Sequence, residues 1–265
     1  MITFPNAKIN IGLQVIGTRP DGYHELETVF YPVSLYDALE VVDSKETKII
    51  ATGLPIPDGP ENICAKAYAL LQGEFDLPPV DIHLHKAIPM GAGLGGGSAD
   101  GAFLIKLLNR HFSLGMDVHQ MQEYARKLGA DCAFFIENTP SFATGRGDQF
   151  MEVDIDLNDY YFAIIKPDIH ISTAEAFRDV YINKEGRQLK RNIQAPVRDW
   201  RNLIVNDFER SVFDRYPIVG EIKDELYQEG AIYASMSGSG SAVFGIFEEQ
   251  VTLTELAKRH HVLYC

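Results

Sequence analysis

The sequence has few cysteines, and their arrangement predicts no joint role. Cys64, Cys132 and Cys265 are the only three in 265 residues, and they lie far apart in the chain. An odd and widely spaced set predicts neither a disulfide framework nor a paired-cysteine metal site. We therefore expect a reducing, cytoplasmic setting for this protein.

Basic residues are also scarce compared with acidic ones. The chain has 24 lysines and arginines against 37 aspartates and glutamates, which gives a formal net charge of -13. Because an acidic surface repels the phosphates of nucleic acids, we expect no nucleic-acid partner. A site for a phosphorylated ligand must then depend on local N–H groups, a lysine or a metal ion rather than on the field of the whole protein.

Long apolar runs are absent as well. No stretch of 18 apolar residues occurs, so the sequence predicts no membrane-spanning helix. Residues 1–6 lack the charged and apolar segments of a signal peptide, so none is predicted. Apolar residues make up 46% of the chain, which is enough for a core, and the length suits one large domain or two modest ones.

Glycine, in contrast, is concentrated in one stretch, Pro89-Met90-Gly91-Ala92-Gly93-Leu94-Gly95-Gly96-Gly97-Ser98-Ala99. The alternating residues 80–85 before it predict a strand, and a helical pattern begins at Ser98. Glycine permits positive φ and close approach to a ligand, while a helix N-terminus offers free N–H groups. These features together predict a phosphate-binding cradle, in which Ser98 either caps the helix or binds a metal ion through its hydroxyl.

Other interpretations of this loop compete with one another. Gly91, Gly93 and Gly96 match the dinucleotide fingerprint, but a second helix follows where that fold needs a strand. The P-loop motif fails because Gly97 stands where its lysine belongs. A different kinase loop, which ends in Gly-Gly-Ser at a helix start, fits the spacing, and a flexible linker is the alternative without a function.

The order of the expected elements indicates the fold class. In the first half we expect strands at 9–15, 29–33, 38–42, 48–51 and 80–85, and helices at 62–72, after the glycine stretch and at 117–128. In the second half we expect strands at 160–165, 231–236, 242–247 and 261–264, helices at 173–180, 205–213, 219–228 and 251–259, and a charged surface segment at 183–201. This order predicts an α+β sandwich with helices on one face of an antiparallel sheet. We place a domain boundary after residue 155, which gives domains 1–155 and 156–265.

Four motifs, in the same order along the chain, resemble those of the GHMP kinases (galactose, homoserine, mevalonate and phosphomevalonate kinases). They are Pro5-Asn6-Ala7-Lys8-Ile9-Asn10, the 89–99 stretch, Gly129-Ala130-Asp131 and Ser237-Gly238-Ser239-Gly240. One departure is Cys132-Ala133, where the family often has Val-Pro. The resemblance implies an N-terminal domain like the second domain of ribosomal protein S5 and a C-terminal ferredoxin-like sandwich. It also implies an enzyme that uses ATP and Mg²⁺ to phosphorylate a small alcohol.

The same resemblance implies a catalytic pair, Lys8 and Asp131. Taken alone, Lys8 is typical of an exposed lysine on an edge strand, and Asp131 of an N-cap. The family role makes Asp131 the base that accepts the hydroxyl proton. Lys8 would keep that carboxylate ionised and stabilise the developing alkoxide. Residues 89–99 would bind ATP, with the metal ion held mostly by nucleotide and water.

The turn Asp21-Gly22-Tyr23-His24 narrows the resemblance to kinases whose acceptor is a cytidine-diphosphate-linked methylerythritol. It implies phosphorylation of the acceptor's 2-hydroxyl in the non-mevalonate isoprenoid pathway. Tyr23 would stack on the cytosine and His24 would bind its polar edge. The resemblance implies further substrate contacts from Asn10, Thr173, Phe177, Gly238, Ser239 and Gly240. Without it, Phe177 would be helix core, and the glycines near 240 a hairpin turn.

Three other functions stay open at this point, and one of them, an RNA-binding protein with a similar N-terminal fold, is disfavoured by the acidic net charge. Another is a GHMP kinase with a mevalonate-like or sugar-like acceptor, which the Tyr23-His24 pair disfavours. The third is a nucleotide-binding module without catalysis, which the presence of both Lys8 and Asp131 disfavours.

Overall fold

The computed structural model describes residues 1–57, 59–180, 182 and 188–265. The chain divides into two compact units. Unit 1 consists of Met1–Lys8, Ser34–Met90 and Gly95–Thr139, and unit 2 of Ile9–Val33, Gly91–Leu94 and Pro140–Cys265. The expected boundary after residue 155 falls inside unit 2, and the division into domains 1–155 and 156–265 stays a prediction.

The helices and strands have the following bounds. The strands are β1 (Ile2–Thr3), β2 (Asn6–Thr18), β3 (His24–Tyr36), β4 (Ala38–Asp43), β5 (Lys48–Gly53), β6 (Val80–Lys86), β7 (Ser141–Thr144), β8 (Gln149–Glu152), β9 (Tyr161–Lys166), β10 (Tyr233–Met236), β11 (Val243–Phe247) and β12 (His261–Tyr264). The α-helices are α1 (Ile63–Phe75), α2 (Gly96–His111), α3 (Val118–Leu128), α4 (Phe134–Glu137), α5 (Thr173–Arg178), α6 (Leu189–Asn192), α7 (Trp200–Leu203), α8 (Phe208–Arg215), α9 (Pro217–Gln228) and α10 (Thr254–Ala257). Short 3₁₀ turns are η1 (Gly59–Glu61), η2 (Ala130–Ala133) and η3 (Val197–Asp199).

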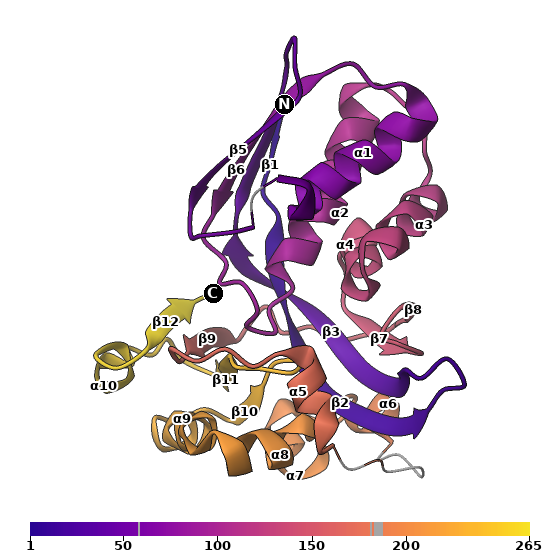
Figure 1. Cartoon of the computed structure of the whole chain (residues 1–265). Coiled ribbons are helices and arrows are strands. Elements are labelled where there is room, and N and C mark those ends of the chain that lie inside the picture. Colours follow the sequence, from indigo (N-terminus) through magenta and orange to yellow (C-terminus); the bar gives the residue numbers. More distant parts are fainter. Residues whose placement is uncertain (58, 181, 183–187) are drawn as a thin grey trace. The chain divides into compact units, whose positions relative to one another are not determined.

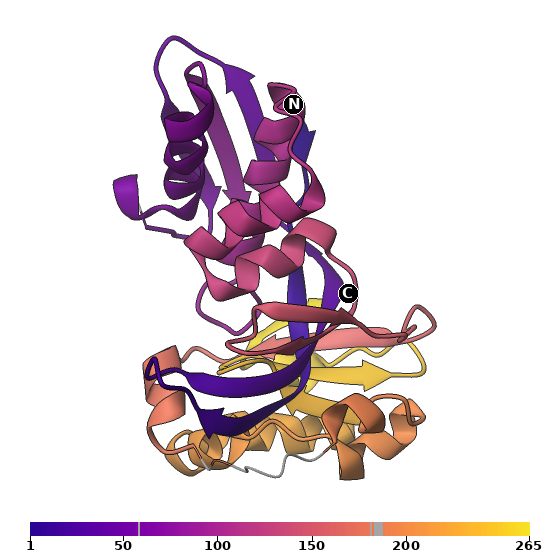
Figure 2. The ribbon, with the colours of Figure 1, turned by 90° about the vertical axis from the view of Figure 1, so that its right-hand side faces the viewer.

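Unit 1 is a sheet covered by helices on one face. The strand order is β1-β4-β6-β5, antiparallel except for the parallel pair of β5 and β6. Alternate residues such as Leu39, Val41, Ile82 and Leu84 are fully buried, as the period of a half-covered strand requires. Helices α1, α2 and α3 lie on that buried face (Figures 1 and 2). The glycine stretch therefore connects the end of β6 to the start of α2.

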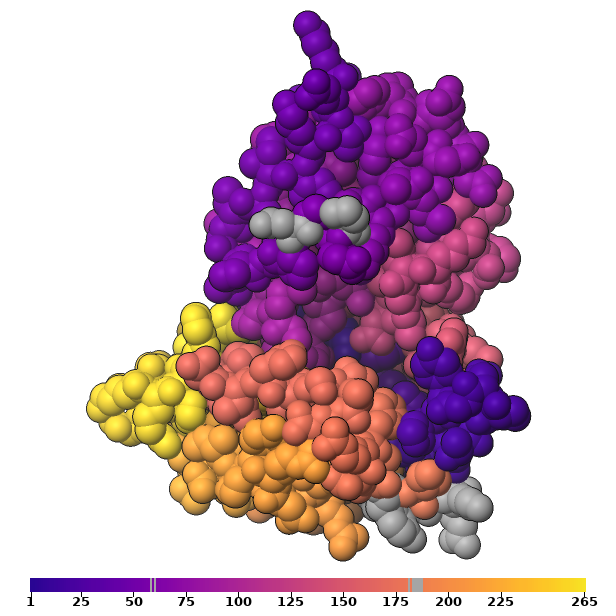
Figure 3. All heavy atoms as spheres, in the orientation of Figure 1, coloured from indigo at the N-terminus to yellow at the C-terminus, as the bar shows by residue number. Residues whose placement is uncertain are grey.

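Unit 2 contains two further sheets, ordered β2-β3-β7-β8 and β10-β11-β9-β12. Its core joins α8 and α9 to the second sheet, with Val212, Ile222 and Leu226 among the buried residues that pack with Ile165 and Val243. Figure 3 shows the dark-blue residues of the β2–β3 hairpin beside salmon and orange residues of the same unit that come much later in the chain. This arrangement brings His24 to α5.

Most of the expected elements are confirmed, and so is the α+β class. Helix α3 begins with the predicted capping box, in which the side chains of Asp117 and Gln120 each accept from the other's backbone N–H. The predicted capping role of Ser98 is wrong. Helix α2 starts two residues earlier, with Gly95 as its N-cap at φ 69°, a conformation that glycine adopts without strain.

In the expected surface segment, residues 183–187 lie outside the described part of the chain. The short helices α6 and α7 with η3 account for most of the remainder. None of the helices described is both long and apolar enough to cross a lipid bilayer.

Candidate active site

Lys8 and Asp131 form an ion pair inside unit 1. Lys8 Nζ lies 3.4 Å from Asp131 Oδ2, and the two side chains are 4% and 36% exposed. The alternative of an exposed lysine is therefore wrong for Lys8. The alternative of an N-cap is wrong for Asp131 too, because Gly129 precedes η2 and Asp131 is its second residue. A buried ammonium needs a counter-charge, and Asp131 supplies it while keeping one side open to a ligand.

The end of the glycine stretch packs directly on this pair. A Cβ on Gly95 would lie 3.1 Å from Cγ and Cε of Lys8 and 2.9 Å from Cζ of Phe135. Gly95 also has φ 69°, so both its backbone and its surroundings require glycine. The first N–H groups of α2 and the ion pair are thus close neighbours within one unit. That is the arrangement needed to act on a phosphate and a hydroxyl together.

Ser98, the third residue of α2, faces the segment that carries Asp131. Burial raises the pKa of the Cys132 thiol to about 12, and the Ser98 hydroxyl lowers it only in part. Cys132 is therefore a neutral packing residue at pH 7. A role of the Ser98 hydroxyl at a metal ion stays a prediction.

A buried ionic network lies under the glycine stretch, and it was not predicted from the sequence. The Lys86 ammonium donates to Asp37 and, at 2.7 Å, to Asp100, and all three side chains are at most 2% exposed. Asp37 Oδ1 also accepts from the N–H groups of Ala87 and Ile88, just before the loop. A Cβ on Gly96 would lie 2.9 Å from Lys86 Nζ. The network therefore fixes the chain on both sides of the glycine loop.

One cation shared by two buried carboxylates leaves one negative charge poorly compensated. Burial raises the pKa of Asp100 to about 7, Lys86 lowers it in part, and Asp37 raises it further. Asp100 Oδ1 has no hydrogen-bond partner among the described residues. We conclude that folding drives a proton onto Asp100 over much of the acidic range.

This leads to a prediction about the pH dependence of stability. The pKa of Asp100 is higher in the folded protein than in the unfolded chain, where it is about 4. Asp100 therefore makes its full contribution to the free energy of unfolding only below about pH 4. This contribution is lost as the pH rises through about 7. Asp100→Asn has no carboxyl group to ionise at this position. Its free energy of unfolding should therefore rise relative to that of wild type as the pH increases between these values.

Urea unfolding of both proteins from pH 4.5 to 8 measures that difference. Glu74→Gln is the control, because Glu74 is an exposed carboxylate of α1 in the same unit. A difference between Asp100→Asn and wild type that does not change with pH would contradict the assignment.

In unit 2, the tip of the glycine loop is bound to the second glycine loop. Ser237 Oγ donates to the carbonyl of Gly93 at 2.8 Å and accepts from the N–H of Asn10 at 3.2 Å. The N–H of Ala242 donates to Ala92 O at 3.1 Å. A Cβ on Gly93 would lie 1.9 Å from Ser237 O, so only glycine fits there. The 237–241 loop does join the antiparallel strands β10 and β11, but it also holds the tip of the first glycine loop.

Asn206 holds this second loop and was not predicted from the sequence. Its amide, 2% exposed, donates at 2.8 Å to the carbonyls of both Met236 and Gly238, and its oxygen accepts from the N–H of Phe208. Neighbouring sequence contains no pattern that marks this residue, because its partners lie 30 and 32 positions away.

Tyr23 was expected to stack on the base with Phe177 as the opposing ring and His24 at its polar edge, but the structure brings His24, not Tyr23, against Phe177. His24 stacks on Phe177 with ring centroids 4.5 Å apart and an interplanar angle of 17°. Phe177 in turn meets Phe208 edge to face, at 4.7 Å. Tyr23 is 57% exposed, and the Arg146 guanidinium lies 5.0 Å from the centre of its ring. The ring that faces Phe177 is therefore His24 rather than Tyr23.

Two other residues predicted to contact the substrate, Asn10 and Thr173, lie on different elements of unit 2. Asn10 is 2% exposed and donates to Thr28 Oγ1 at 2.9 Å, so this amide group braces the sheet. Thr173 Oγ1 lies 3.5 Å from Ser239 Oγ, which places α5 beside the second glycine loop. Their contacts with a substrate stay predictions.

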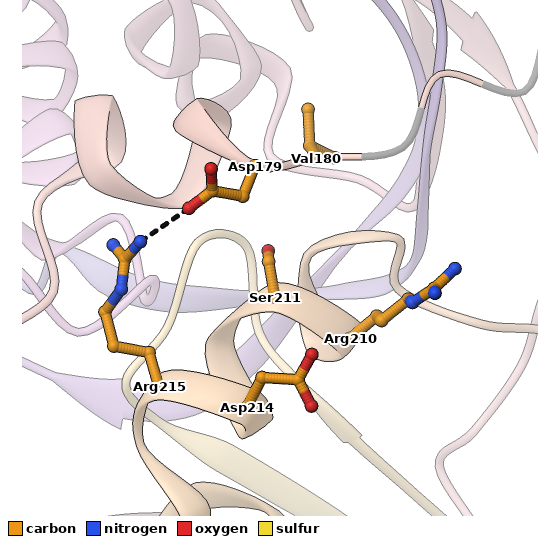
Figure 4. A pocket seen from close by; sticks show the side chains of 6 residues that line it. All are labelled: Asp179, Val180, Arg210, Ser211, Asp214 and Arg215. Atoms are coloured by element: carbon orange, nitrogen blue, oxygen red, sulfur yellow. Dashed lines mark hydrogen bonds and ion pairs between the residues drawn. The ribbon is translucent and has the colours of Figure 1, made fainter.

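A separate hollow in unit 2 contains none of the predicted site residues. It has a volume of about 620 Å³ and is lined by Asp179, Val180, Arg210, Ser211, Asp214 and Arg215 (Figure 4). Arg215 is tied to Asp179 and Glu175. The two arginines are balanced by acids, so the hollow offers no net charge to a ligand.

Among the residues described, no three His, Cys, Asp or Glu side chains lie close enough to hold a metal ion.

Comparison with known proteins gives consistent matches along the chain. Residues 62–139 match the GHMP kinases N terminal domain, and residues 189–260 match GHMP kinases C terminal. The chain is 54% identical over 261 residues to a 4-diphosphocytidyl-2-C-methyl-D-erythritol kinase of Bacteroides fragilis, covering 97% of this chain and 95% of that one. It is 46% identical over 262 residues to the enzyme of the same name in Porphyromonas gingivalis, with 97% and 96% covered.

Solved structures give the same result. A crystal structure of 4-(cytidine 5'-diphospho)-2C-methyl-D-erythritol kinase matches with a TM-score of 0.84 and 29% identity over 100% of this chain and 98% of that one. The mevalonate kinase of Methanococcus jannaschii, at 16% identity and a TM-score of 0.74 over 100% and 97% of the two chains, shares the fold.

Proposed function

The chain belongs to the GHMP kinases and, among them, to the 4-diphosphocytidyl-2-C-methyl-D-erythritol kinases, and from this premise we propose its reaction. It transfers the γ-phosphoryl group of ATP to the 2-hydroxyl of 4-diphosphocytidyl-2-C-methyl-D-erythritol, a step of the non-mevalonate pathway to isoprenoid precursors. Apart from the family itself, the observation that carries the proposal is the ion pair of Lys8 and Asp131 beside the start of α2.

In this proposal Asp131 is the general base. The Lys8 ammonium at 3.4 Å favours the ionised carboxylate, and the exposed side of Asp131 leaves room for an acceptor hydroxyl. As the hydroxyl oxygen attacks, its proton passes to Asp131. The buried charge of Lys8 then stabilises the developing alkoxide, because fixed charges act strongly where water is excluded.

The glycine stretch is the proposed site of the ATP phosphates. Gly91, Gly93 and Gly95 all have positive φ, which glycine adopts freely, and none of the three has a side chain that would obstruct the approach of a phosphate. Mg²⁺ would neutralise charge on the phosphates. Because the described residues contain no cluster of metal-binding side chains, its ligands would be nucleotide oxygens and water, with the hydroxyl of Ser98 as the candidate from the protein.

The cytosine is proposed to bind at the aromatic group of unit 2. Rings 4.5 Å apart have no space between them for a base, so His24 must move aside before a base can stack on Phe177. Stacking tolerates any base, so the choice of cytosine depends on hydrogen bonds to its edge, from His24 and nearby backbone groups.

The activity itself is tested by incubating the protein with ATP, Mg²⁺ and a panel of alcohols. The panel contains the cytidyl acceptor, mevalonate and a sugar, with ADP release as the readout and ³¹P NMR to identify the phosphorylated hydroxyl. We expect turnover with the cytidyl acceptor alone. Turnover only with another alcohol would show that the protein is a different GHMP kinase. ATP binding without any turnover would show that it is a nucleotide-binding module without catalysis.

We propose that the exposed ring of Tyr23 stacks on the cytosine as well, so the acceptor site is tested with Tyr23→Ala. Loss of one stacking ring should raise the acceptor KM by ~5–150-fold, which corresponds to ~1–3 kcal/mol, and leave the ATP KM nearly unchanged. Tyr161→Ala is the control, since Tyr161 is also exposed, at 47%, and lies in the same unit. Equal kcat/KM for cytidyl and uridyl forms of the acceptor would exclude recognition through the cytosine.

A further inference from the structure

Asn6 and Asn138 exchange two hydrogen bonds inside unit 1. Asn138 Nδ2 donates to Asn6 Oδ1 at 2.7 Å, and Asn6 Nδ2 donates back to Asn138 Oδ1 at 3.2 Å. Asn6 is 5% exposed and also donates to Ala7 O at 2.9 Å. Such a reciprocal pair needs a donor and an acceptor on both side chains, which an amide provides and a carboxylate does not.

The pair joins the two segments that carry the ion pair. Asn6 stands two residues before Lys8 in β2, so both lie on the same face of the strand. Asn138 ends the short helical segment that starts with η2, seven residues after Asp131, and its N–H donates to Phe134 O. The amide pair is thus a second link between strand and segment, beside the ion pair itself.

The far side of the segment is held by other helices. Lys106 of α2 donates to Phe135 O at 3.2 Å, and Gln122 of α3 donates to Glu137 at 2.8 Å. These bonds fix the segment to the helical layer, whereas the amide pair fixes it to the strand of Lys8. A lysine side chain has four rotatable bonds, so the position of its ammonium depends on where the strand stands relative to the carboxylate.

We propose that Asn6 and Asn138 are positioning residues that set the separation between Lys8 Nζ and the Asp131 carboxylate. The proposal rests on the proposed function only in treating that ion pair as catalytic. Catalysis is sensitive to displacements of about 1 Å, so losing the pair should reduce kcat without weakening the binding of either substrate.

The backbone conformation at Asn138 allows a substitution that removes only the side-chain amide. Its φ is 60°, a value that asparagine tolerates and glycine adopts freely, so Asn138→Gly removes the amide without straining the chain. Asp76→Gly is a matched control. Asp76 also ends a helix of unit 1, at φ 48°, and its side chain is exposed.

We expect Asn138→Gly to lower kcat by about 5- to 30-fold, an intermediate loss of the kind seen when a catalytic group is misplaced but present. Both KM values should stay within about twofold of wild type, and Asp76→Gly should leave kcat unchanged. Asn138→Asp keeps an acceptor for Asn6 but loses the donor, so its kcat should fall between those of wild type and Asn138→Gly. In an Asp131→Asn background, Asn138→Gly should cause no further loss, because the group that it positions is already disabled.

A second readout does not depend on turnover. In ¹H–¹⁵N spectra of lysine ammonium groups, the Lys8 signal, identified by its absence in Lys8→Arg, should shift or broaden in Asn138→Gly and not in Asp76→Gly. Unchanged kcat together with an unchanged Lys8 signal would overturn the inference, and so would equal losses of kcat with and without Asp131. A shifted Lys8 signal in a protein that does not phosphorylate the cytidyl acceptor would support the positioning role and overturn the proposed function instead.

Discussion

Asp131→Asn should lower kcat by ~10²–10⁴-fold, the usual effect of losing a general base, with little change in ATP affinity. The amide keeps the size of the side chain but cannot accept the proton of the attacking hydroxyl. It also leaves the Lys8 ammonium, 4% exposed, without its counter-charge. Because an unpaired buried charge is destabilising, the melting temperature is measured alongside the kinetics.

The structure makes this experiment easier to interpret than the sequence alone would. Asp131 does not cap η2, so a loss of activity cannot be assigned to a lost N-cap. Asp43→Asn, an exposed carboxylate of the same unit, should retain full activity. If Asp131→Asn keeps more than about a tenth of the wild-type kcat, short of the range expected for a base, the assignment of the base is wrong.

The features predicted from the sequence are those whose causes are local. The glycine loop is an example, since strand alternation, glycine conformation and a helix start all act over neighbouring residues. The capping box at Asp117 is another, because its two hydrogen bonds join residues three positions apart. Ser98 was misplaced as a cap because Gly95 and Gly96 let α2 begin earlier, and composition does not show where a glycine-rich helix starts.

The features that were missed depend on partners far away in the chain. Lys86 ends a strand with an alternating pattern, and its partners Asp37 and Asp100 are 49 and 14 positions away. Nothing near Lys86 shows that its ammonium is buried. The same holds for Asn206 and for the stacking of His24 on Phe177. Lys8 and Asp131 were predicted to be a catalytic pair only through the family resemblance, since each residue taken singly is typical of a structural role.

A protein with an acidic net charge can bind the proposed anionic ligands only if local groups at the site attract them. With a formal charge of -13, the whole protein does not attract a triphosphate. Besides Mg²⁺, the proposed sources of attraction are the N–H groups at the start of α2 and the ammonium of Lys8, whose side chain packs against Gly95. The backbone of the glycine stretch should therefore be the most sensitive part of the nucleotide site.

Gly95→Val is accordingly expected to abolish measurable ATP binding while the protein stays folded. At φ 69° a β-branched residue is strained, and its Cβ would meet Lys8 and Phe135 at about 3 Å. Either the loop or the lysine must move, and each change removes part of the phosphate site. Gly96→Val should have a similar effect, because its Cβ would lie 2.7 Å from Cγ2 of Ile88 and 2.9 Å from Lys86 Nζ.

Gly73→Val provides the matched control for this last experiment. Gly73 lies in α1 of the same unit, and a Cβ there would meet nothing within 4 Å. Calorimetric titration with ATP and Mg²⁺ should give wild-type affinity for Gly73→Val and no detectable heat for Gly95→Val, with both variants unfolding cooperatively. Wild-type ATP affinity in a folded Gly95→Val protein would mean that the phosphates bind elsewhere, because no arrangement of this loop can keep its N–H groups in place and also accommodate a branched side chain against Lys8.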